Sequence, residues 1–209
     1  TVNSLSADEW YSTYGRIYKE LIDYGAPTVM SAHIRQPALT RSIAPDIKDE
    51  DILPGSLSRE LNEGVLRGKL GFNGVIVSDA TQMVGFTCSM PRYKAVPTAI
   101  EHGVDIFLFT IDQKEDIGYM LDGLKNGLLS ERRLDEAVTR ILALKASLGL
   151  NKPVELPDEE GLKKILRCEE HLAIGREVAD KNITLVKDRQ SLLPLDPAKH
   201  RRIKLIQCT

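Results

Sequence analysis

The stretch Gly71–Met83, with the sequence GFNGVIVSDATQM, decides the fold of this chain. Its centre is the run Val75–Val77, which is β-branched and uncharged, and Asp79 follows where the run stops. An uninterrupted apolar run between turn residues is typical of a strand buried on both faces in a parallel sheet. We therefore expect Asp79 at the carboxyl end of a strand, where parallel α/β proteins place their functional side chains.

Position alone supports two interpretations of Asp79 equally. It could be the N-cap of the next helix, where its carboxylate would accept hydrogen bonds from backbone N–H groups of the first turn. It could instead be a functional carboxylate at the edge of the sheet. Evidence from other segments of the chain is needed to distinguish the helix cap from the functional carboxylate.

Helix and strand patterns alternate along the chain at a spacing of about 30 residues, which is typical of parallel βα units. The predicted order is helix, strand, helix, strand, helix, strand, helix, helix, over residues 6–24, 27–34, 58–69, 75–79, 93–102, 105–110, 117–124 and 130–148. Three strands cannot close an eight-stranded barrel. After residue 150 the pattern changes to a segment with Pro153 and Pro157, then a helix over 169–181 and strands over 183–187 and 202–206.

Composition sets limits on the partners of the protein. A chain of 209 residues with 42% hydrophobic content can bury the core of one domain, or of one domain and part of another. A net charge of −2 gives no electrostatic reason to expect a nucleic acid or an anionic membrane as a partner. No apolar run approaches the roughly 18 residues that span a bilayer. We expect a soluble, enzyme-like protein.

Cysteines and metal-binding patterns give few signals. Cys88, Cys168 and Cys208 are widely spaced, so we expect free thiols, and free thiols favour a reducing, cytoplasmic location. Secretion stays open because the chain begins with Thr1 and not with Met. The acidic loop 46–51 lacks the alternating spacing of a calcium loop, so we expect no metal. We expect no cofactor, since neither a Gly-rich phosphate loop nor an H-E-x-x-H pattern is present.

Several segments together resemble the region around the catalytic nucleophile of family 3 glycoside hydrolases. They are Pro54–Ser58 (PGSLS), residues 66–67 (LR) and Leu70–Asp79 (LGFNGVIVSD), with Met83 following. The match fixes about ten positions in order, which makes it specific. The resemblance implies a retaining glycoside hydrolase that removes a terminal, non-reducing β-linked sugar through a covalent glycosyl-Asp79 intermediate.

The same resemblance implies a domain organisation. Residues 1–150 would be the C-terminal part of a (β/α)₈ catalytic barrel, namely its last three βα units. Residues 151–168 would be a linker, and residues 169–209 the beginning of a second α/β sandwich domain. The first five barrel strands would lie before Thr1, so the expected partner of this chain is the missing N-terminal part of the same barrel.

The family resemblance also suggests residues that bind the carbohydrate substrate. Met30, His33 and Met83 fall in segments that line the sugar pocket, with His33 as a candidate contact to a sugar hydroxyl. A histidine near a strand end is more often a hydrogen-bonded structural group, and that interpretation stays open. The family takes its proton donor from a His-Asp pair on a barrel loop or from a Glu of the second domain, and neither is recognisable here.

Residue 80 bears on the preferred sugar. Many β-glucosidases of the family carry a Trp after the nucleophile, whereas this chain has Ala80. A small residue there resembles the β-N-acetylglucosaminidase (β-hexosaminidase) branch, so we expect an exo-β-N-acetylglucosaminidase. A β-glucosidase or β-xylosidase of the same family is the alternative.

Two other classes of function stay open from the sequence. The chain could be a non-catalytic fragment that is inactive without the missing strands. It could also be a different barrel enzyme, such as a phosphate-binding lyase or an aldolase, with Asp79 as a general acid or base. A Schiff-base lysine at a strand end would favour the aldolase, but none of the three strands predicted within residues 1–150 ends in one.

Overall fold

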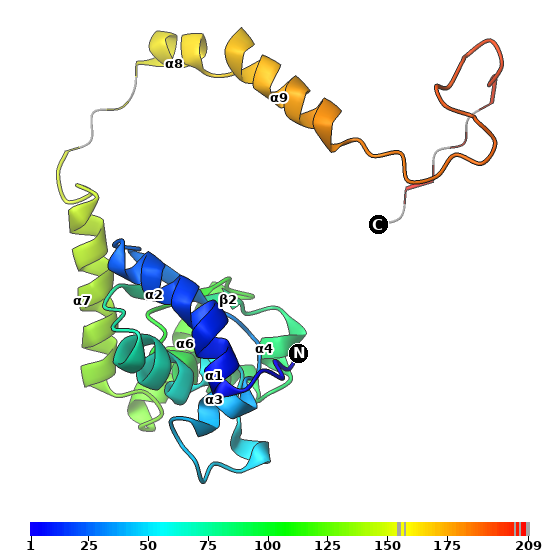
Figure 1. Cartoon of the computed structure of the whole chain (residues 1–209). Coiled ribbons are helices and arrows are strands. Elements are labelled where there is room, and N and C mark those ends of the chain that lie inside the picture. Colours follow the sequence, from blue (N-terminus) through cyan, green and yellow to red (C-terminus); the bar gives the residue numbers. More distant parts are fainter. Residues whose placement is uncertain (154–155, 157, 203, 205, 208–209) are drawn as a thin grey trace. The chain divides into compact units, whose positions relative to one another are not determined.

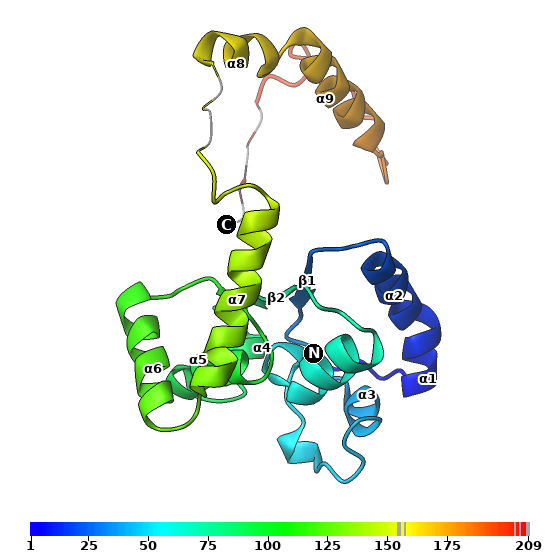
Figure 2. The same cartoon turned by 90° about the vertical axis from the view of Figure 1, so that its left-hand side faces the viewer.

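A computed structural model describes residues 1–153, 156, 158–202, 204, 206 and 207. The chain divides into two units, Thr1–Pro153 and Val154–Thr209. In the first unit, α1 and α2 lie on one side of the strands and α5, α6 and α7 on the other (Figures 1 and 2). Its helices are α1 (Ala7–Trp10), η1 (Tyr11–Gly15), α2 (Arg16–Asp23), α3 (Pro37–Arg41), η2 (Asp49–Asp51), η3 (Gly55–Leu57), η4 (Glu60–Lys69), α4 (Val84–Thr87), α5 (Arg92–Glu101), α6 (Gln113–Lys125) and α7 (Glu131–Ser147).

The sheet consists of three parallel strands in the order β1-β2-β3. The strands are β1 (Thr28–Ser31), β2 (Val75–Ala80) and β3 (Ile106–Leu108). Met30 of β1 pairs with Val77 of β2, which in turn pairs with Ile106 of β3. The predicted parallel βα order is therefore confirmed, and the strand that carries Asp79 lies in the middle. A register shift follows between Val77 and Ala80.

The two faces of β2 have different surroundings. Ile76 and Ser78 are fully buried, and Ile76 packs in the hydrophobic core. Val77 and Asp79 are half-buried, and Met30, which pairs with Val77 on the other face, is 54% exposed. Burial, as predicted for the whole apolar run, is therefore confirmed for Val75 and Ile76 and wrong for Val77, because the face of Val77 is only partly covered in the part of the chain that the structure describes.

The first predicted helix begins at its predicted cap, whereas the second begins two residues after its predicted cap, Ser58. Ser6 and Glu9 form a capping box at the start of α1, in which the Ser6 hydroxyl accepts the Glu9 N–H at 3.2 Å. The helix continues through η1, a π-helical segment, into α2, and Gly25 at φ 99° ends it. The second helix is η4, also π-helical, and Ser58 accepts the Leu61 N–H at 3.3 Å before it.

The three remaining predicted helices of this unit correspond to α5, α6 and α7. Helix α6 begins at Gln113, earlier than predicted, because Asp112 accepts hydrogen bonds from the N–H groups of Lys114 and Glu115 at 2.8 and 2.9 Å. Ser130 caps α7 by accepting the Arg133 N–H at 3.3 Å. Local capping thus determines where both helices start.

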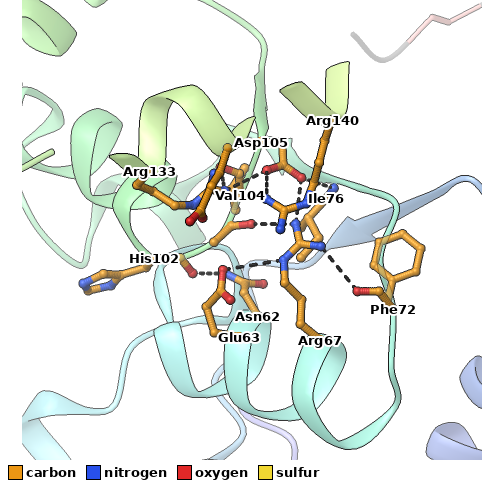
Figure 3. Close-up of polar contacts among 12 residues, drawn as sticks. Asn62, Glu63, Arg67, Phe72, Ile76, His102, Val104, Asp105, Arg133 and Arg140 are labelled. Carbon is orange, nitrogen blue, oxygen red and sulfur yellow. Dashed lines mark hydrogen bonds and ion pairs between the residues drawn. The ribbon is translucent and has the colours of Figure 1, made fainter. Parts of the chain in front are cut away.

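A buried carboxylate joins β2, β3, η4 and α7 at the amino ends of the strands (Figure 3). Asp105, which precedes β3, accepts hydrogen bonds from Arg67, Arg133 and the Ile76 N–H at 2.8, 2.8 and 2.9 Å, and Arg140 lies 3.5 Å away. Burial lowers the pKa of Arg67, and the charge of Arg140 lowers it further, while Asp105 opposes both effects. Asp105 therefore anchors the surrounding helices to the sheet.

The second unit contains two helices among its described residues, α8 (Glu159–Ile165) and α9 (Glu169–Asn182). The helix predicted for residues 169–181 is confirmed. The linker predicted for residues 151–168 contains α8, because Asp158 caps it through the N–H groups of Glu160 and Gly161. Residues 183–187 do not form the predicted strand, since no described segment pairs with them. The strand predicted for residues 202–206 includes positions that lie outside the described residues.

Cys88 and Cys168 are free thiols, whereas Cys208 lies outside the described residues. None of the helices in the described part of the chain is both long enough and apolar enough to span a membrane.

Candidate active site

Asp79 lies near the carboxyl end of β2 and its side chain is half-buried. Its Oδ1 accepts the N–H of Ala80 at 2.7 Å, and this is the one hydrogen bond to the carboxylate from the described residues. The helix-cap interpretation does not apply, because α4 begins at Val84 and its N-cap is Met83. Asp79 therefore keeps most of its acceptor capacity for a ligand or for water.

The backbone around Asp79 is fixed to β3 across the register shift. The Ser78 hydroxyl donates to the Asp79 carbonyl at 2.8 Å and accepts the Leu108 N–H at 2.9 Å. The Thr81 N–H donates to the Leu108 carbonyl at 2.5 Å. Sequence reasoning missed Ser78, and its place beside the candidate nucleophile was the available signal.

A buried ion pair supports the segment that follows Asp79. The Arg92 guanidinium donates to both carboxylate oxygens of Asp116, at 2.8 and 2.6 Å, and the Asp116 side chain is 1% exposed. Arg92 also donates to the hydroxyl and the carbonyl of buried Thr81, at 3.1 and 3.2 Å. The Thr81 hydroxyl donates to the Phe109 carbonyl at 2.6 Å. Sequence reasoning missed this pair too, although a cation in the first turn of a helix opposes the helix dipole and was a possible signal.

His33 lies two residues beyond β1 and is 6% exposed. Its Nδ1 lies 2.6 Å from the Ser56 hydroxyl, and its Nε2 lies 2.9 Å from the Ala80 carbonyl. The structure therefore brings His33 next to the residue that follows Asp79, and both ring nitrogens have partners within the chain. The sugar-hydroxyl contact suggested for His33 stays a prediction.

Met30 and Met83, the other predicted substrate-binding residues, are 54% and 49% exposed. In parallel strands, paired residues point to the same face, so Met30 and Val77 share one face of the sheet. Met83 follows β2 as the N-cap of α4. Neither side chain is held in the core, so both are available to a ligand.

A cavity of about 590 Å³ lies between the N-terminal helices, β1 and η4. Met30 and Val29 line it together with Trp10 and Leu61, but Asp79 is not among its lining residues. This cavity is therefore distinct from the surface around Asp79. Nowhere among the described residues do three or more His, Cys, Asp or Glu side chains form a group that could hold a metal ion.

Comparison with known families agrees with this architecture. The profile of the "Glycosyl hydrolase family 3 N terminal domain" matches residues 2–144. The chain therefore belongs to glycosyl hydrolase family 3.

Three relatives show how much of the chain this similarity covers. A "Beta-N-acetylglucosaminidase/beta-glucosidase" of Cellulomonas fimi is 46% identical over 97% of this chain and 36% of its own length. A solved structure of the beta-glucoside phosphorylase BglX is 54% identical, with a TM-score of 0.82 over 95% of this chain and 36% of that chain. A family 3 beta-N-acetylglucosaminidase from Paenibacillus sp. str. FPU-7 is 27% identical, with a TM-score of 0.71 over 90% of this chain and 34% of that chain.

The chain spans only about a third of the length of these relatives, 36%, 36% and 34% respectively. Similarity extends over nearly the whole of this chain in each case.

Proposed function

We propose that Asp79 is the catalytic nucleophile of a retaining β-glycosidase. The observation that carries the proposal is the position of its carboxylate, which lies near the carboxyl end of the middle strand with one described hydrogen-bond donor, the Ala80 N–H at 2.7 Å. An ionised carboxylate with free lone pairs can attack the anomeric carbon and form a glycosyl ester. Water then attacks that carbon, and the carboxylate is released.

We further propose that the chain is part of a longer protein, called the parent enzyme below. In the parent, residues 1–150 would supply the last three βα units of a (β/α)₈ barrel, and residues 169–209 would begin an α/β sandwich domain. Strands β1 and β3 are the edges of the sheet in the described part of the chain, and proteins normally cover such edges, which supports additional strands on both sides. The N-terminal part of the barrel is then the partner that completes the pocket.

The proton donor for the leaving group would come from the parent enzyme and not from this chain. Retaining glycosidases need a donor about 5 Å from the nucleophile. Neither the His-Asp pair nor the Glu from which the family takes its donor is recognisable in this sequence. We therefore expect the isolated chain to be inactive towards substrates whose leaving group needs a proton.

For the substrate, we propose a terminal β-linked N-acetylglucosamine, with a β-glucoside or β-xyloside as alternatives. Ala80 supports the first choice, because a small side chain after the nucleophile leaves room beside the sugar. The name of the Cellulomonas fimi relative covers both an N-acetylglucosaminide and a glucoside, so it supports either choice. Met30 and Met83 would form an apolar wall of the sugar pocket, as their exposure allows.

A second candidate reaction is phosphorolysis, which the 54% identical beta-glucoside phosphorylase favours. In that reaction a phosphate oxygen, instead of water, attacks the anomeric carbon of the glycosyl-Asp79 ester. The C–O bond to Asp79 breaks, and a glycosyl phosphate leaves. Nucleophile and first step are the same in both reactions.

The proposal can be tested with nitrophenyl β-glycosides of N-acetylglucosamine, glucose and xylose on the parent enzyme, with and without inorganic phosphate. We expect turnover of one or more of them to fall at least about a thousandfold in Asp79→Ala. A glycosyl phosphate product would establish phosphorolysis, and the free sugar would establish hydrolysis. Activity above a thousandth of the starting rate in Asp79→Ala would reject the assignment of the nucleophile.

A further inference from the structure

The tautomer of His33 follows from its partners. The Ala80 carbonyl can only accept a hydrogen bond, so the contact of 2.9 Å requires the proton on Nε2. In the neutral ring Nδ1 is then an acceptor, and the Ser56 hydroxyl donates to it at 2.6 Å. With 6% exposure and two engaged nitrogens, the ring has no free polar atom to offer a sugar hydroxyl.

Neighbours also restrict the ring of His33. The Phe86 ring lies with its centroid 5.3 Å from that of the imidazole. Gly85 lies so close that a Cβ there would be 2.7 Å from the His33 Cβ and 3.0 Å from the His33 carbonyl oxygen. Both residues belong to α4, so the helix after Asp79 packs directly on the histidine.

The acceptor of this histidine is part of a tight turn. The Ala80 carbonyl also accepts the Met83 N–H at 3.0 Å, which closes a turn over residues 80–83. The peptide unit between Ala80 and Thr81 is held at both ends, because its carbonyl receives His33 and its N–H donates to Leu108. The orientation of the turn is thus determined by residues from both neighbouring strand ends.

The same turn carries the one described donor to the candidate nucleophile. Ala80 offers its N–H to Asp79 and its carbonyl to His33, so a rotation of residue 80 would change both contacts. We propose that His33 is a positioning residue that orients the Asp79 carboxylate through Ala80. This inference rests on the proposed function of Asp79, and it assigns His33 a role different from a direct contact with the sugar.

The first test is the rate at which Asp79 is labelled in the parent enzyme. A fluorinated glycosyl fluoride of the preferred sugar is a suitable probe, because its leaving group needs no proton donor; the second fluorine is at C5 for N-acetylglucosamine and at C2 for glucose or xylose. Labelling is followed by intact mass, and its dependence on probe concentration separates the binding constant Ki from the rate constant kinact. For His33→Ala we expect kinact to fall on the order of tenfold to a hundredfold, the usual effect of a misplaced reacting group, with Ki unchanged.

Two amide variants provide the matched comparison. Gln places an N–H donor about as far from the backbone as His Nε2, whereas Asn is too short to reach the Ala80 carbonyl. His33→Gln should therefore recover most of the lost kinact, and His33→Asn should not. His102→Ala is the control for structural effects, since His102 also hydrogen-bonds a backbone carbonyl, that of Leu57 at 2.6 Å, and lies close to the start of β3.

Each other result would overturn the inference. A rise in Ki with constant kinact would make His33 a sugar contact. A kinact unchanged in His33→Ala, equal values in the Gln and Asn variants, or a loss matched by His102→Ala would leave His33 with no positioning role. Failure of the proposed function looks different, because the wild-type protein itself would then carry no label on Asp79.

Discussion

Two aspartates mark opposite ends of the same small sheet. Asp105, at the amino end of β3, is fully buried and receives Arg67, Arg133 and the Ile76 N–H within 2.9 Å. Asp79, near the carboxyl end of β2, is half-buried and receives the Ala80 N–H among the described residues. The lone pairs of Asp105 are occupied by the protein, whereas most of those of Asp79 are free.

This difference separates a structural carboxylate from a reactive one. A carboxylate that accepts several strong hydrogen bonds contributes to stability only while its partners stay in place. A carboxylate with free lone pairs contributes little to stability but can attack an electrophile. Substitutions at the two ends should therefore change different quantities, catalysis at Asp79 and the free energy of unfolding at Asp105.

The largest expected effect is at Asp79. In the parent enzyme Asp79→Ala should lower kcat at least about a thousandfold, because the covalent step loses its nucleophile. The melting temperature should change little, since the carboxylate has a single described hydrogen bond. Steady-state kinetics with an activated aryl glycoside and a thermal melt measure both quantities. A large fall in the melting temperature would show that Asp79, like Asp105, contributes to stability, which would contradict the difference between the two carboxylates.

Asp105→Asn tests the opposite end. Loss of the buried charge leaves three arginines without their carboxylate, and we expect a destabilisation of about 3–5 kcal/mol. The turnover of the molecules that remain folded should stay close to that of the wild type. Urea unfolding gives the first quantity, and active-site titration with the fluorinated probe gives the second. A change below about 1 kcal/mol would contradict the anchoring role of Asp105.

Substitution of Arg92 tests whether the Arg92–Asp116 ion pair stabilises the fold as much as the ion pairs of Asp105 do. Arg92→Ala leaves Asp116 buried without a partner, so we expect a loss of about 3 kcal/mol. Arg92→Lys should lose less stability than Arg92→Ala, although an ammonium cannot make the bidentate contact with Asp116. Arg132→Ala is the matched control, because its pair with Glu136 is on the surface and should contribute less than about 0.5 kcal/mol. Equal losses in Arg92→Ala and Arg132→Ala would show that the Arg92 pair does not support the site.

The carboxylate of Glu101 is intermediate between those of Asp79 and Asp105 in its hydrogen bonding. Its substitution should give the smallest of the four effects. Burial raises its pKa, but hydrogen bonds from the Ser130 N–H and hydroxyl and from Arg59 together lower it below the ordinary 4.5. A lowered pKa means that the stabilising contribution is complete above pH 4.5 and is lost as the pH falls through the folded-state pKa. The difference in melting temperature between wild type and Glu101→Gln should therefore decrease as the pH falls below 4.5. A difference that stays constant would contradict the lowered pKa.

Local sequence signals predicted most of the first unit. Apolar periodicity and capping residues such as Ser6, Ser58 and Ser130 indicated the helices, and the run before Asp79 indicated the middle strand. Helix α6 began earlier than expected because the cap at Asp112 was not recognised. These features depend on residues close in sequence, so a single sequence contains them.

Contacts between distant segments could not be predicted in the same way. Arg92 and Asp116 are 24 positions apart, and Arg67 and Asp105 are 38 positions apart, so only the folded chain brings each pair together. In the segment 183–187 the local signal was present, since its β-branched residues predict a strand, but no described segment pairs with it. His33 was selected from its sequence context, whereas its two hydrogen-bond partners became visible only in the fold.

The most direct test of the central claim is to locate the covalent intermediate. The parent enzyme would be incubated with fluorinated glycosyl fluorides of the candidate sugars, with the trapping fluorine at C2 for glucose and xylose and at C5 for N-acetylglucosamine. It would then be digested and analysed by peptide mass spectrometry, with Asp79→Ala and Asp105→Asn as controls. The account predicts one glycosyl group on Asp79 in the wild type and in folded Asp105→Asn, and none in Asp79→Ala. A glycosyl group on another residue of an active wild-type enzyme would contradict it.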